Sequence, residues 1–391
     1  MEEGVSTPSA YRVLETMPWK RSLIDRLRDL TPGTTRVAYV YERAEPGTFR
    51  YRCYNMAQAI NQDSSDWSAS YFFLSDLLSL DSLAEYADIL VLVRVRFDSD
   101  VERLVRSFRL AEKPVFYDLD DHIFDLDATP LLVASLDQGL SRFGRIEKWV
   151  GVVGRIRRSL EVADAVLTTT DFLKGQIEGA VNVPVRVLKN FLNQEQWDYS
   201  AKLREEHVPR DSDHPIIGYF SGSASHNRDY QLAEHGLATV METYPHARLR
   251  IAGYLDVPPR LSRFADRIDR LPFMDFLGLQ RAIGESTLNL SPIQRNVFSH
   301  SKSELKYFEA AAAGTLTVAS PAPVFLQAIQ HGHNGFLADA LDWPDVLLDA
   351  LRQSPEERSS AEANALQHVA DNYIPRAMAG HIVATLRELS S

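Results

Sequence analysis

Short apolar segments alternate with helix-forming segments along most of the chain, and this alternation limits the fold more than any other feature. The expected strands are the segments 37–41, 87–95, 115–117, 164–168, 185–191, 215–220, 248–252, 268–271, 287–290 and 316–319. Strands that alternate with helices form βαβ units, in which helices cover both faces of a parallel sheet. The sequence therefore predicts the α/β class with Rossmann-like topology.

The length of the chain predicts more than one domain. Its 391 residues exceed what a single hydrophobic core usually serves. The segment 195–214 is polar and poor in strand-forming residues, so we interpret it as an interdomain linker. The predicted organisation comprises four parts, which are an extension at 1–35, a first domain at 36–195, a second domain at 196–373 and a terminal helix at 374–391.

Composition excludes several classes of protein. The chain has 45% hydrophobic and 24% charged residues, as soluble globular proteins do. Its net charge of -11 argues against a nucleic-acid-binding protein, which needs basic residues to neutralise phosphates. A single cysteine, Cys53, excludes an intramolecular disulfide and any multi-cysteine metal site. Neither an apolar run long enough to span a membrane nor a secretory signal is recognisable, which predicts a cytoplasmic protein.

One local basic cluster stands against the acidic background. Arg155, Arg157 and Arg158 lie close together in a segment expected to be helical. The cluster suits either a solvated helix face or a patch for anionic lipid or a lipid-diphosphate acceptor. The second reading would bring the protein to the inner face of the membrane.

The segment 299–320 gathers polar groups immediately before an apolar strand. Residues 303–313 favour a helix, which Gly314 would end before the strand 316–319. Lys302, Lys306 and Glu309 are spaced by four and three, so they share one face of such a helix. Two ammonium groups and one carboxylate suit a ligand with phosphate at one end and hydroxyls at the other. A solvated helix with internal ion pairs is the alternative.

A second polar group follows the strand 115–117, where Asp118, Asp120 and Asp121 occur in quick succession. Ligands of open α/β sheets bind beyond the carboxyl ends of the strands, so these aspartates are candidate catalytic residues. An Asp-x-Asp pattern also suits a divalent cation. The structural alternative is that they cap backbone N–H groups and pair with Arg94 or Arg96.

Other polar candidates lie in loops after strands. Arg50 and Arg52 end the loop that follows the strand 37–41, where they could reach an acceptor or a diphosphate. The Gly/Ser turn at 221–229 follows the strand 215–220 and could cradle phosphate with its backbone N–H groups. The turn is not a Gly-x-Gly-x-x-Gly dinucleotide fingerprint, and neither is the loop before Arg50.

The run Lys-Tyr-Phe-Glu-Ala-Ala-Ala-Ala-Gly-Thr at 306–315, followed by a Val-Ala-Ser strand, resembles the donor-sugar segment of the retaining GT-B glycosyltransferases, the large family 4 group. The strands at 163–170 and 185–191 and the Asn-Gly-Phe-Leu element at 334–337 are similar to family elements in the same order. The resemblance implies a GT-B fold with an acceptor domain, a donor domain and a C-terminal helix that crosses back to the first domain.

The resemblance also implies roles for individual residues. Glu309 matches the glutamate that holds the ribose of the nucleotide sugar. Ser301 stands where a second glutamate usually lies near the sugar hydroxyls, so Ser301, Lys302 or Glu304 would substitute for it. Asp120 stands where a histidine usually faces the transferred sugar.

The phosphate end of the implied site also departs from the family pattern. Ser223 follows Gly222 where the family has an arginine that grips the diphosphate. The charge would then come from His226, Arg228, Lys302 and Lys306. Arg52, Arg96 and Asn190 would line the acceptor side of the cleft.

The function implied is transfer of a hexose or deoxyhexose from a nucleoside diphosphate sugar to a growing glycan or lipid-linked saccharide of the bacterial surface. Family analogy implies retention of the anomeric configuration, without a metal and without a cofactor beyond the nucleotide-sugar co-substrate. Two rival functions remain. One is a non-catalytic nucleotide-sugar-binding partner of a glycan assembly complex, suggested by the departures at 223 and 301. The other is a sugar-nucleotide epimerase of the same fold.

Overall fold

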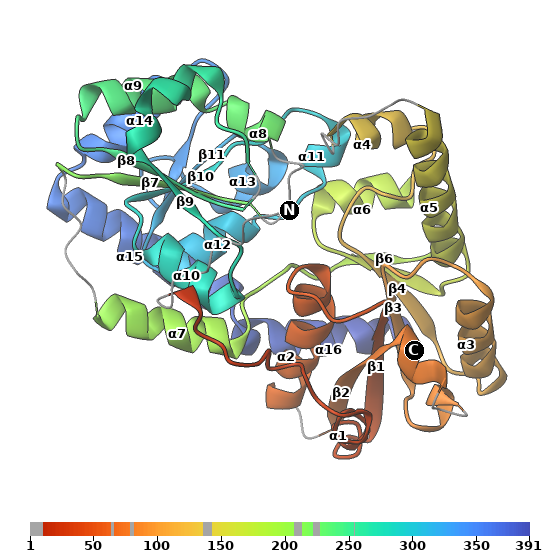
Figure 1. Ribbon diagram of the computed structural model, residues 1–391. Helices are drawn as coiled ribbons and strands as arrows, with labels where there is room; N and C mark the ends of the chain where they lie inside the picture. Colours follow the sequence, from red (N-terminus) through yellow and green to blue (C-terminus); the bar gives the residue numbers. More distant parts are fainter. Residues whose placement is uncertain are drawn as a thin grey trace.

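The computed structural model describes residues 11–63, 66–78, 82–135, 143–206, 213–221, 227–253 and 255–391. Within these residues the chain forms two α/β domains that lie side by side, each built on a six-stranded sheet (Figure 1). Every pairing between neighbouring strands is parallel. The predicted pair of Rossmann-like sheets is therefore confirmed.

The first sheet has the strand order β2-β1-β3-β4-β5-β6. Its strands are β1 (Thr35–Tyr41), β2 (Trp67–Phe73), β3 (Ile89–Val93), β4 (Val115–Leu119), β5 (Ala165–Thr168) and β6 (Val185–Val187). All five residues of β3, Ile-Leu-Val-Leu-Val, are buried, as expected for a central parallel strand covered on both faces. The strand β2 is absent from the sequence prediction, since its Trp-Ser-Ala-Ser-Tyr start reads as polar.

The second sheet has the strand order β12-β11-β10-β7-β8-β9. Its strands are β7 (Ile216–Phe220), β8 (Arg248–Ala252), β9 (Ile268–Leu271), β10 (Leu288–Ser291), β11 (Leu316–Ala319) and β12 (Phe336–Leu337). In both sheets the strand order reverses beside the first strand of the domain. Parallel sheets bind ligands at such switch points, beyond the carboxyl ends of the strands.

Helices cover both faces of the two sheets (Figure 1). Those of the first domain are α1 (Leu23–Arg28), α2 (Asn55–Asp63), α3 (Ser99–Leu110), α4 (Thr129–Ser135), α5 (Phe143–Glu161) and α6 (Asp171–Glu178). Those that follow are α7 (Gln194–Glu205), α8 (Asn227–Gln231), α9 (Glu234–Thr243), α10 (Phe276–Gly284), α11 (Val297–His300), α12 (Leu305–Ala312), α13 (Pro323–Ala328), α14 (Trp343–Arg352), α15 (Pro355–Asn372) and α16 (Pro375–Ser390).

The segment 195–214, predicted as an interdomain linker, begins within a helix, α7. The side chain of Asn193 accepts a hydrogen bond from the backbone N–H of Gln196, and the side chain of Gln196 accepts one from the backbone N–H of Asn193, so the two residues form a capping box at the start of α7. The polar composition concealed this helix, although α7 packs on α10 and α12.

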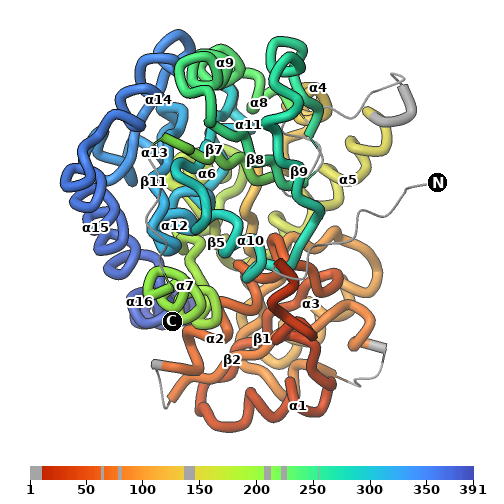
Figure 2. The backbone as a smooth tube through the Cα atoms, turned by 60° about the vertical axis from the view of Figure 1, so that its left-hand side comes forward, coloured from red at the N-terminus to blue at the C-terminus, as the bar shows by residue number. Residues whose placement is uncertain are grey.

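The last helix, α16, returns to the first domain, as predicted. The chain turns at Tyr373, whose backbone C=O accepts a hydrogen bond from the N–H of Leu192. From there α16 packs against α2, and Arg186 in β6 forms an ion pair with Glu388 at 2.6 Å. Figure 2 shows α16 beside α2 and α7. The C-terminal helix therefore ties the two domains together.

The segment before α1 makes a second connection between the domains. At its beginning, the backbone N–H groups of Val13 and Leu14 donate to Asp275, which also caps α10 in the second domain. Further along, Trp19 stacks on Phe276 of α10 and meets Phe49 of the first domain edge-on. This segment, residues 11–22, acts as a strap across the domain boundary.

Candidate functional site

A cavity of about 850 Å³ lies between the two domains. One wall comes from the first domain, from the end of β1, the loop 42–48 and the residues that follow β3 and β4. The other wall comes from the ends of β7 to β10 and from α10 and α12 of the second domain. Because the carboxyl ends of both sheets meet there, the cavity lies where the topology of each domain predicts a ligand.

Two ammonium groups reach the cavity beside the N-terminus of α12. The Nζ atom of Lys306 lies 4.0 Å from the centre of the Tyr219 ring, and Nζ of Lys302 lies 5.1 Å from the centre of the Phe298 ring. Neither ammonium group forms an ion pair with a residue in the described part of the chain. Partly desolvated cations without a direct ion-pair partner favour an anionic ligand, and the helix N-terminus adds to this preference.

The half-buried position of Lys306 also changes its acidity. Burial lowers the pKa of Lys306 to about 8, and the nearby charge of Lys302 acts in the same direction. Asp229 and Glu309 oppose the shift but do not cancel it. Lys306 therefore changes its charge close to neutral pH, which an ordinary lysine does not.

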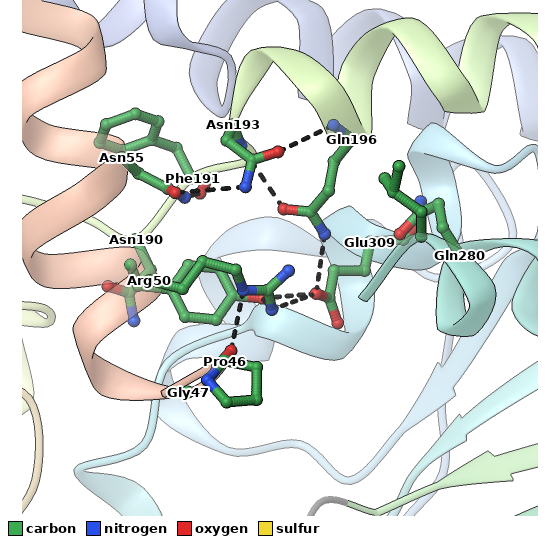
Figure 3. A network of polar contacts seen from close by, with 12 residues as sticks. Pro46, Gly47, Arg50, Asn55, Asn190, Phe191, Asn193, Gln196, Gln280 and Glu309 are labelled. Atoms are coloured by element: carbon green, nitrogen blue, oxygen red, sulfur yellow. Dashed lines mark hydrogen bonds and ion pairs between the residues drawn. The ribbon is translucent and has the colours of Figure 1, made fainter. Parts of the chain in front are cut away.

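Glu309 lines the same cavity one helical turn after Lys306, and its side chain is held by three donors (Figure 3). Arg50 Nη2 donates to Glu309 Oε1 at 3.1 Å and Gln196 Nε2 donates to it at 3.2 Å. The hydroxyl of Tyr51 donates to the same oxygen. No described residue donates to the other oxygen, Oε2.

Two carboxylates of the first domain, those of Asp120 and Asp121, line the opposite wall of the cavity. Asp120 accepts hydrogen bonds from Thr48 Oγ1 at 2.7 Å and from Arg94 Nη1 at 3.4 Å, and Asp121 lies 3.7 Å from Arg94 Nη2. Arg94 follows β3 with φ at 50°, a left-handed conformation that is uncommon outside glycine and often occurs at functional sites. Burial raises the pKa of Asp121, while Arg94 and Lys302 lower it.

Residues 214–354 match the family model described as glycosyl transferases group 1. HepE from Anabaena, solved in complex with UDP and glucose, has a similar structure at 12% identity, with a TM-score of 0.61 over 90% of this chain and 100% of that one.

Two further structures are similar over most of the chain. Sucrose-phosphate synthase from Thermosynechococcus elongatus is 14% identical, with a TM-score of 0.56 over 91% of this chain and 99% of its own. OtsA in its apo form is 13% identical, with a TM-score of 0.56 over the same shares of the two chains. No curated protein sequence matches this chain.

The fold is GT-B. The matched residues 214–354 contain the whole of α10 and α12. Lys302, Lys306 and Glu309 therefore lie within the part of this GT-B chain that matches the family.

The predicted site residues fall into two groups. Those that line the cavity are Asp120, Asp121, Asn190, Lys302, Lys306 and Glu309. Asn190 bridges the domains, since its Nδ2 donates to Ser303 Oγ at 2.9 Å while its Oδ1 accepts from Arg52 at 3.1 Å. Sequence reasoning therefore located both walls of the cleft.

Asp118 and Arg52 do not reach the cavity, which corrects their prediction as catalytic and cleft residues. Both are 0% exposed and form a two-fold ion pair with distances of 2.8 and 2.7 Å. Arg52 Nη1 also donates to the C=O of Leu188 and to Asn190. The pair lies in the core of the first domain, because Asp118 belongs to the buried strand β4 and therefore lies before the end of the sheet rather than beyond it.

Ser301 and Arg96 also lie outside the cavity lining. Ser301 is buried and its hydroxyl donates to the C=O of Val297 within α11. Arg96 pairs with Glu42 at the exposed rim. Glu304, the other proposed substitute for the sugar-binding glutamate, is buried and accepts a hydrogen bond from Tyr373. Of the three substitutes proposed from the sequence, Lys302 alone lines the cavity.

The predicted phosphate turn is only partly described. Gly222, Ser223 and His226 lie outside the described residues. Arg228 lies in α8 and is not among the described residues that line the cavity.

Within the described ranges, no group of three or more His, Cys, Asp or Glu side chains could hold a metal ion. The basic cluster is partly neutralised by two nearby acids, since Arg155 pairs with Asp98 while Arg157 and Arg158 share Glu161. None of the described helices is both long enough and apolar enough to cross a bilayer.

Sequence reasoning missed Thr48, Tyr51 and Gln196. Tyr51 belongs to a single π-helical turn, Arg50–Tyr54, that precedes α2. On this turn Arg50 and Tyr51 face Glu309 while Arg52 faces the core. The capping pattern of Asn193 and Gln196 was the one readable signal, and it predicts a helix start rather than a ligand site.

Proposed function

We propose that the protein transfers a glycosyl group from a nucleoside diphosphate sugar to a hydroxyl group of an acceptor. The observation that carries this proposal is the pair Lys302 and Lys306, which form no direct ion pair with a described residue, beside Glu309 in one interdomain cavity. A diphosphate satisfies the two cations, and a polyol satisfies the open carboxylate oxygen. The group 1 glycosyl transferase domain supports the same conclusion.

The arrangement of charge orients the donor. The diphosphate lies against Lys302, Lys306 and the N-terminus of α12, and the ribose lies toward Glu309. The sugar then extends toward the first domain, where Asp120 and Asp121 line the opposite wall. HepE, which shares the fold, has been crystallised with UDP-glucose, and this supports a nucleotide sugar as the ligand.

The chemistry requires stabilisation of two developing charges. The leaving diphosphate gains negative charge, which Lys302, Lys306 and the helix dipole stabilise. The anomeric carbon gains positive charge, which Asp120 stabilises from the other wall. Closure of the two domains excludes water and so limits hydrolysis of the donor. We propose that the transfer retains the anomeric configuration and needs no metal.

The transferred group and the acceptor belong to the same proposal. We assign a hexose or deoxyhexose as the transferred sugar and a growing glycan or glycolipid of the bacterial surface as the acceptor. The acceptor approaches along the first-domain wall, past Thr48 and Arg43, which line the cavity on that side. This places the reaction in the cytoplasm, where nucleotide sugars are available, with contact to the inner face of the membrane for a lipid-linked acceptor.

The test is a thermal-shift panel of UDP-, GDP-, dTDP- and ADP-sugars, each with and without a chelator. A ligand at about a hundred times its dissociation constant stabilises a protein by about 2.7 kcal/mol. We expect one nucleotide to raise the melting temperature equally with and without the chelator. Donor hydrolysis or transfer with that nucleotide sugar then establishes catalysis.

Other outcomes identify the rival functions. Binding without hydrolysis or transfer identifies a non-catalytic nucleotide-sugar-binding protein. Interconversion of the unbound donor sugar identifies an epimerase. No shift with any of the four nucleotides contradicts the proposed donor site.

A further inference from the structure

The carboxylate of Glu309 is held asymmetrically. All three donors that reach it, from Arg50, Tyr51 and Gln196, bind the single oxygen Oε1. Glu309 is only 6% exposed, yet it lines the cavity. Its Oε2 atom is not one of the side-chain atoms that are both fully buried and without a hydrogen-bond partner. Three hydrogen bonds to one oxygen fix the rotation of the carboxylate and leave the other oxygen for a ligand.

Tyr51 is a permanent donor in this arrangement. Burial raises the pKa of Tyr51 well above its ordinary value, so its hydroxyl keeps the proton that it donates to Glu309. Arg50 Nη2 donates both to the Tyr51 hydroxyl, at 2.6 Å, and to Glu309 Oε1. The arginine and the tyrosine therefore support each other as well as the carboxylate.

Arg50 is itself fixed by both domains (Figure 3). Its Nε donates to the C=O of Pro46 at 2.9 Å. Its guanidinium carbon lies 4.3 Å from the centre of the Tyr51 ring and 5.0 Å from that of Phe276, which belongs to the second domain. A planar guanidinium between two aromatic rings loses little freedom when it binds a carboxylate.

From this geometry we propose that Tyr51 and Arg50 of the first domain are positioning residues for the nucleotide-binding site of the second domain. They hold Glu309 Oε1 and thereby direct Oε2 toward the ribose hydroxyls of the donor. This inference rests on the proposed function, and it extends the donor site to residues that lie about 250 positions earlier in the chain.

The proposal couples donor binding to the arrangement of the domains. Glu309 belongs to α12, whereas Arg50 and Tyr51 precede α2, so Oε2 is directed correctly only while the two domains are in contact. A ligand that binds Oε2 must in turn favour that contact, since a ligand stabilises the state to which it binds more tightly.

The experiment compares Tyr51→Phe with the wild-type protein. Calorimetry measures the affinity of a ribonucleoside diphosphate and of its 2′,3′-dideoxy analogue, using the base identified by the thermal-shift panel. We expect the wild type to prefer the ribose compound and Tyr51→Phe to lose about threefold to tenfold of that preference, with the affinity for the dideoxy compound unchanged. A purely structural role would weaken both compounds equally.

The control is Tyr54→Phe. Tyr54 belongs to the same π-helical turn, and its hydroxyl donates to Glu195, a carboxylate that does not line the cavity. The substitution thus removes the same kind of hydrogen bond three residues away. We expect Tyr54→Phe to keep the wild-type preference for ribose.

The outcomes separate this inference from the proposed function. Nucleotide binding by the wild type with an unchanged ribose preference in Tyr51→Phe overturns the positioning role alone. Failure of the wild type to bind any nucleoside diphosphate overturns the proposed function and this inference with it. An equal loss of ribose preference in Tyr54→Phe also overturns the positioning role, because the effect would not depend on Glu309.

Discussion

Two arginines on one π-helical turn each bind a buried carboxylate, but the two pairs differ in location and in how many of their polar atoms have partners. Arg52 and Asp118 are 0% exposed, and each of the three guanidinium nitrogens of Arg52 donates to an acceptor. Arg50 binds Glu309 across the domain boundary with one nitrogen, while its Nη1 has no partner among the described residues. Glu309 in turn keeps an oxygen open to the cavity.

The difference indicates what each pair does. A buried charge pair whose hydrogen bonds are all satisfied has no capacity left for a ligand, so Arg52–Asp118 serves the architecture of the first domain. A pair with unused hydrogen-bonding capacity beside a cavity is arranged for a molecule that completes it. The two pairs are alike in burial and charge, but they differ in how many of their polar atoms have a hydrogen-bond partner.

The largest expected effect comes from breaking the architectural pair. Arg52→Met leaves Asp118 charged, buried and without its partner, so we expect the free energy of unfolding to fall by about 3–5 kcal/mol. Chemical denaturation measures this change. The double variant Arg52→Met/Asp118→Leu removes both charges and should recover much of the loss. Arg36→Met, which breaks the partly exposed pair with Asp88, is the control and should cost less than about 1 kcal/mol.

Arg94 and Asp120 form a third pair of an arginine and a carboxylate. Both residues line the cavity, and their closest nitrogen and oxygen atoms are 3.4 Å apart, which is longer than in the other two pairs. If Asp120 stabilises positive charge on the sugar, Asp120→Asn should lower turnover about 10²- to 10³-fold. The affinity for the donor should stay close to wild type, because the asparagine keeps the size and the bond to Thr48. Turnover at the wild-type rate would show that Asp120 has no part in the chemistry.

Matched substitutions in the two pairs compare them directly. Asp118→Asn should lower the melting temperature and leave donor affinity unchanged. Glu309→Gln should weaken donor binding by about 1–3 kcal/mol, because the uncharged side chain is a poorer acceptor for ribose hydroxyls. Thermal unfolding and calorimetry on the same preparations give both quantities. The reverse pattern, with Asp118→Asn affecting affinity, would mean that the two pairs had been assigned the wrong way round.

The fold was largely readable from the sequence. Runs such as Ile89–Val93 are apolar at every position, which occurs where a strand is covered on both faces. Lys306 and Glu309 were also readable, because a spacing of three places two residues on one helix face whatever the tertiary structure. Such local patterns can be recognised in the sequence without knowledge of the tertiary contacts.

The remainder of the site depends on contacts across the domain boundary. Arg50 and Arg52 are two residues apart in the same turn, and nothing in their local sequence says which one meets Asp118 and which one meets Glu309. That assignment follows from the π-helical geometry of Arg50–Tyr54 and from the position of α12, which tertiary packing determines. Asp118 and Asp120 were predicted to act together for the same reason, although the end of β4 separates them.

The smallest expected effect is the change of nucleotide affinity with pH. It tests whether the ammonium group of Lys306 binds the ligand or serves the architecture of the domain. Burial lowers the pKa of Lys306 to about 8, against an ordinary value of 10.5, while Lys302, Asp229 and Glu309 contribute smaller shifts. The charged fraction of Lys306 therefore falls about tenfold between pH 7 and pH 9, and affinity for a nucleoside diphosphate should fall by up to the same factor.

Stability should change in the opposite direction over this range. Between pH 8 and pH 10.5 the unfolded chain holds a proton on Lys306 that the folded chain has lost, so this group makes unfolding less favourable as pH rises. A fall in affinity therefore cannot be attributed to unfolding caused by Lys306. The Lys306→Arg variant keeps its charge above pH 8, so its affinity for a nucleoside diphosphate should not depend on pH. The Lys306→Met variant should bind the nucleotide weakly at every pH in this range. A wild-type affinity that is constant from pH 7 to pH 9 would remove Lys306 from the phosphate site.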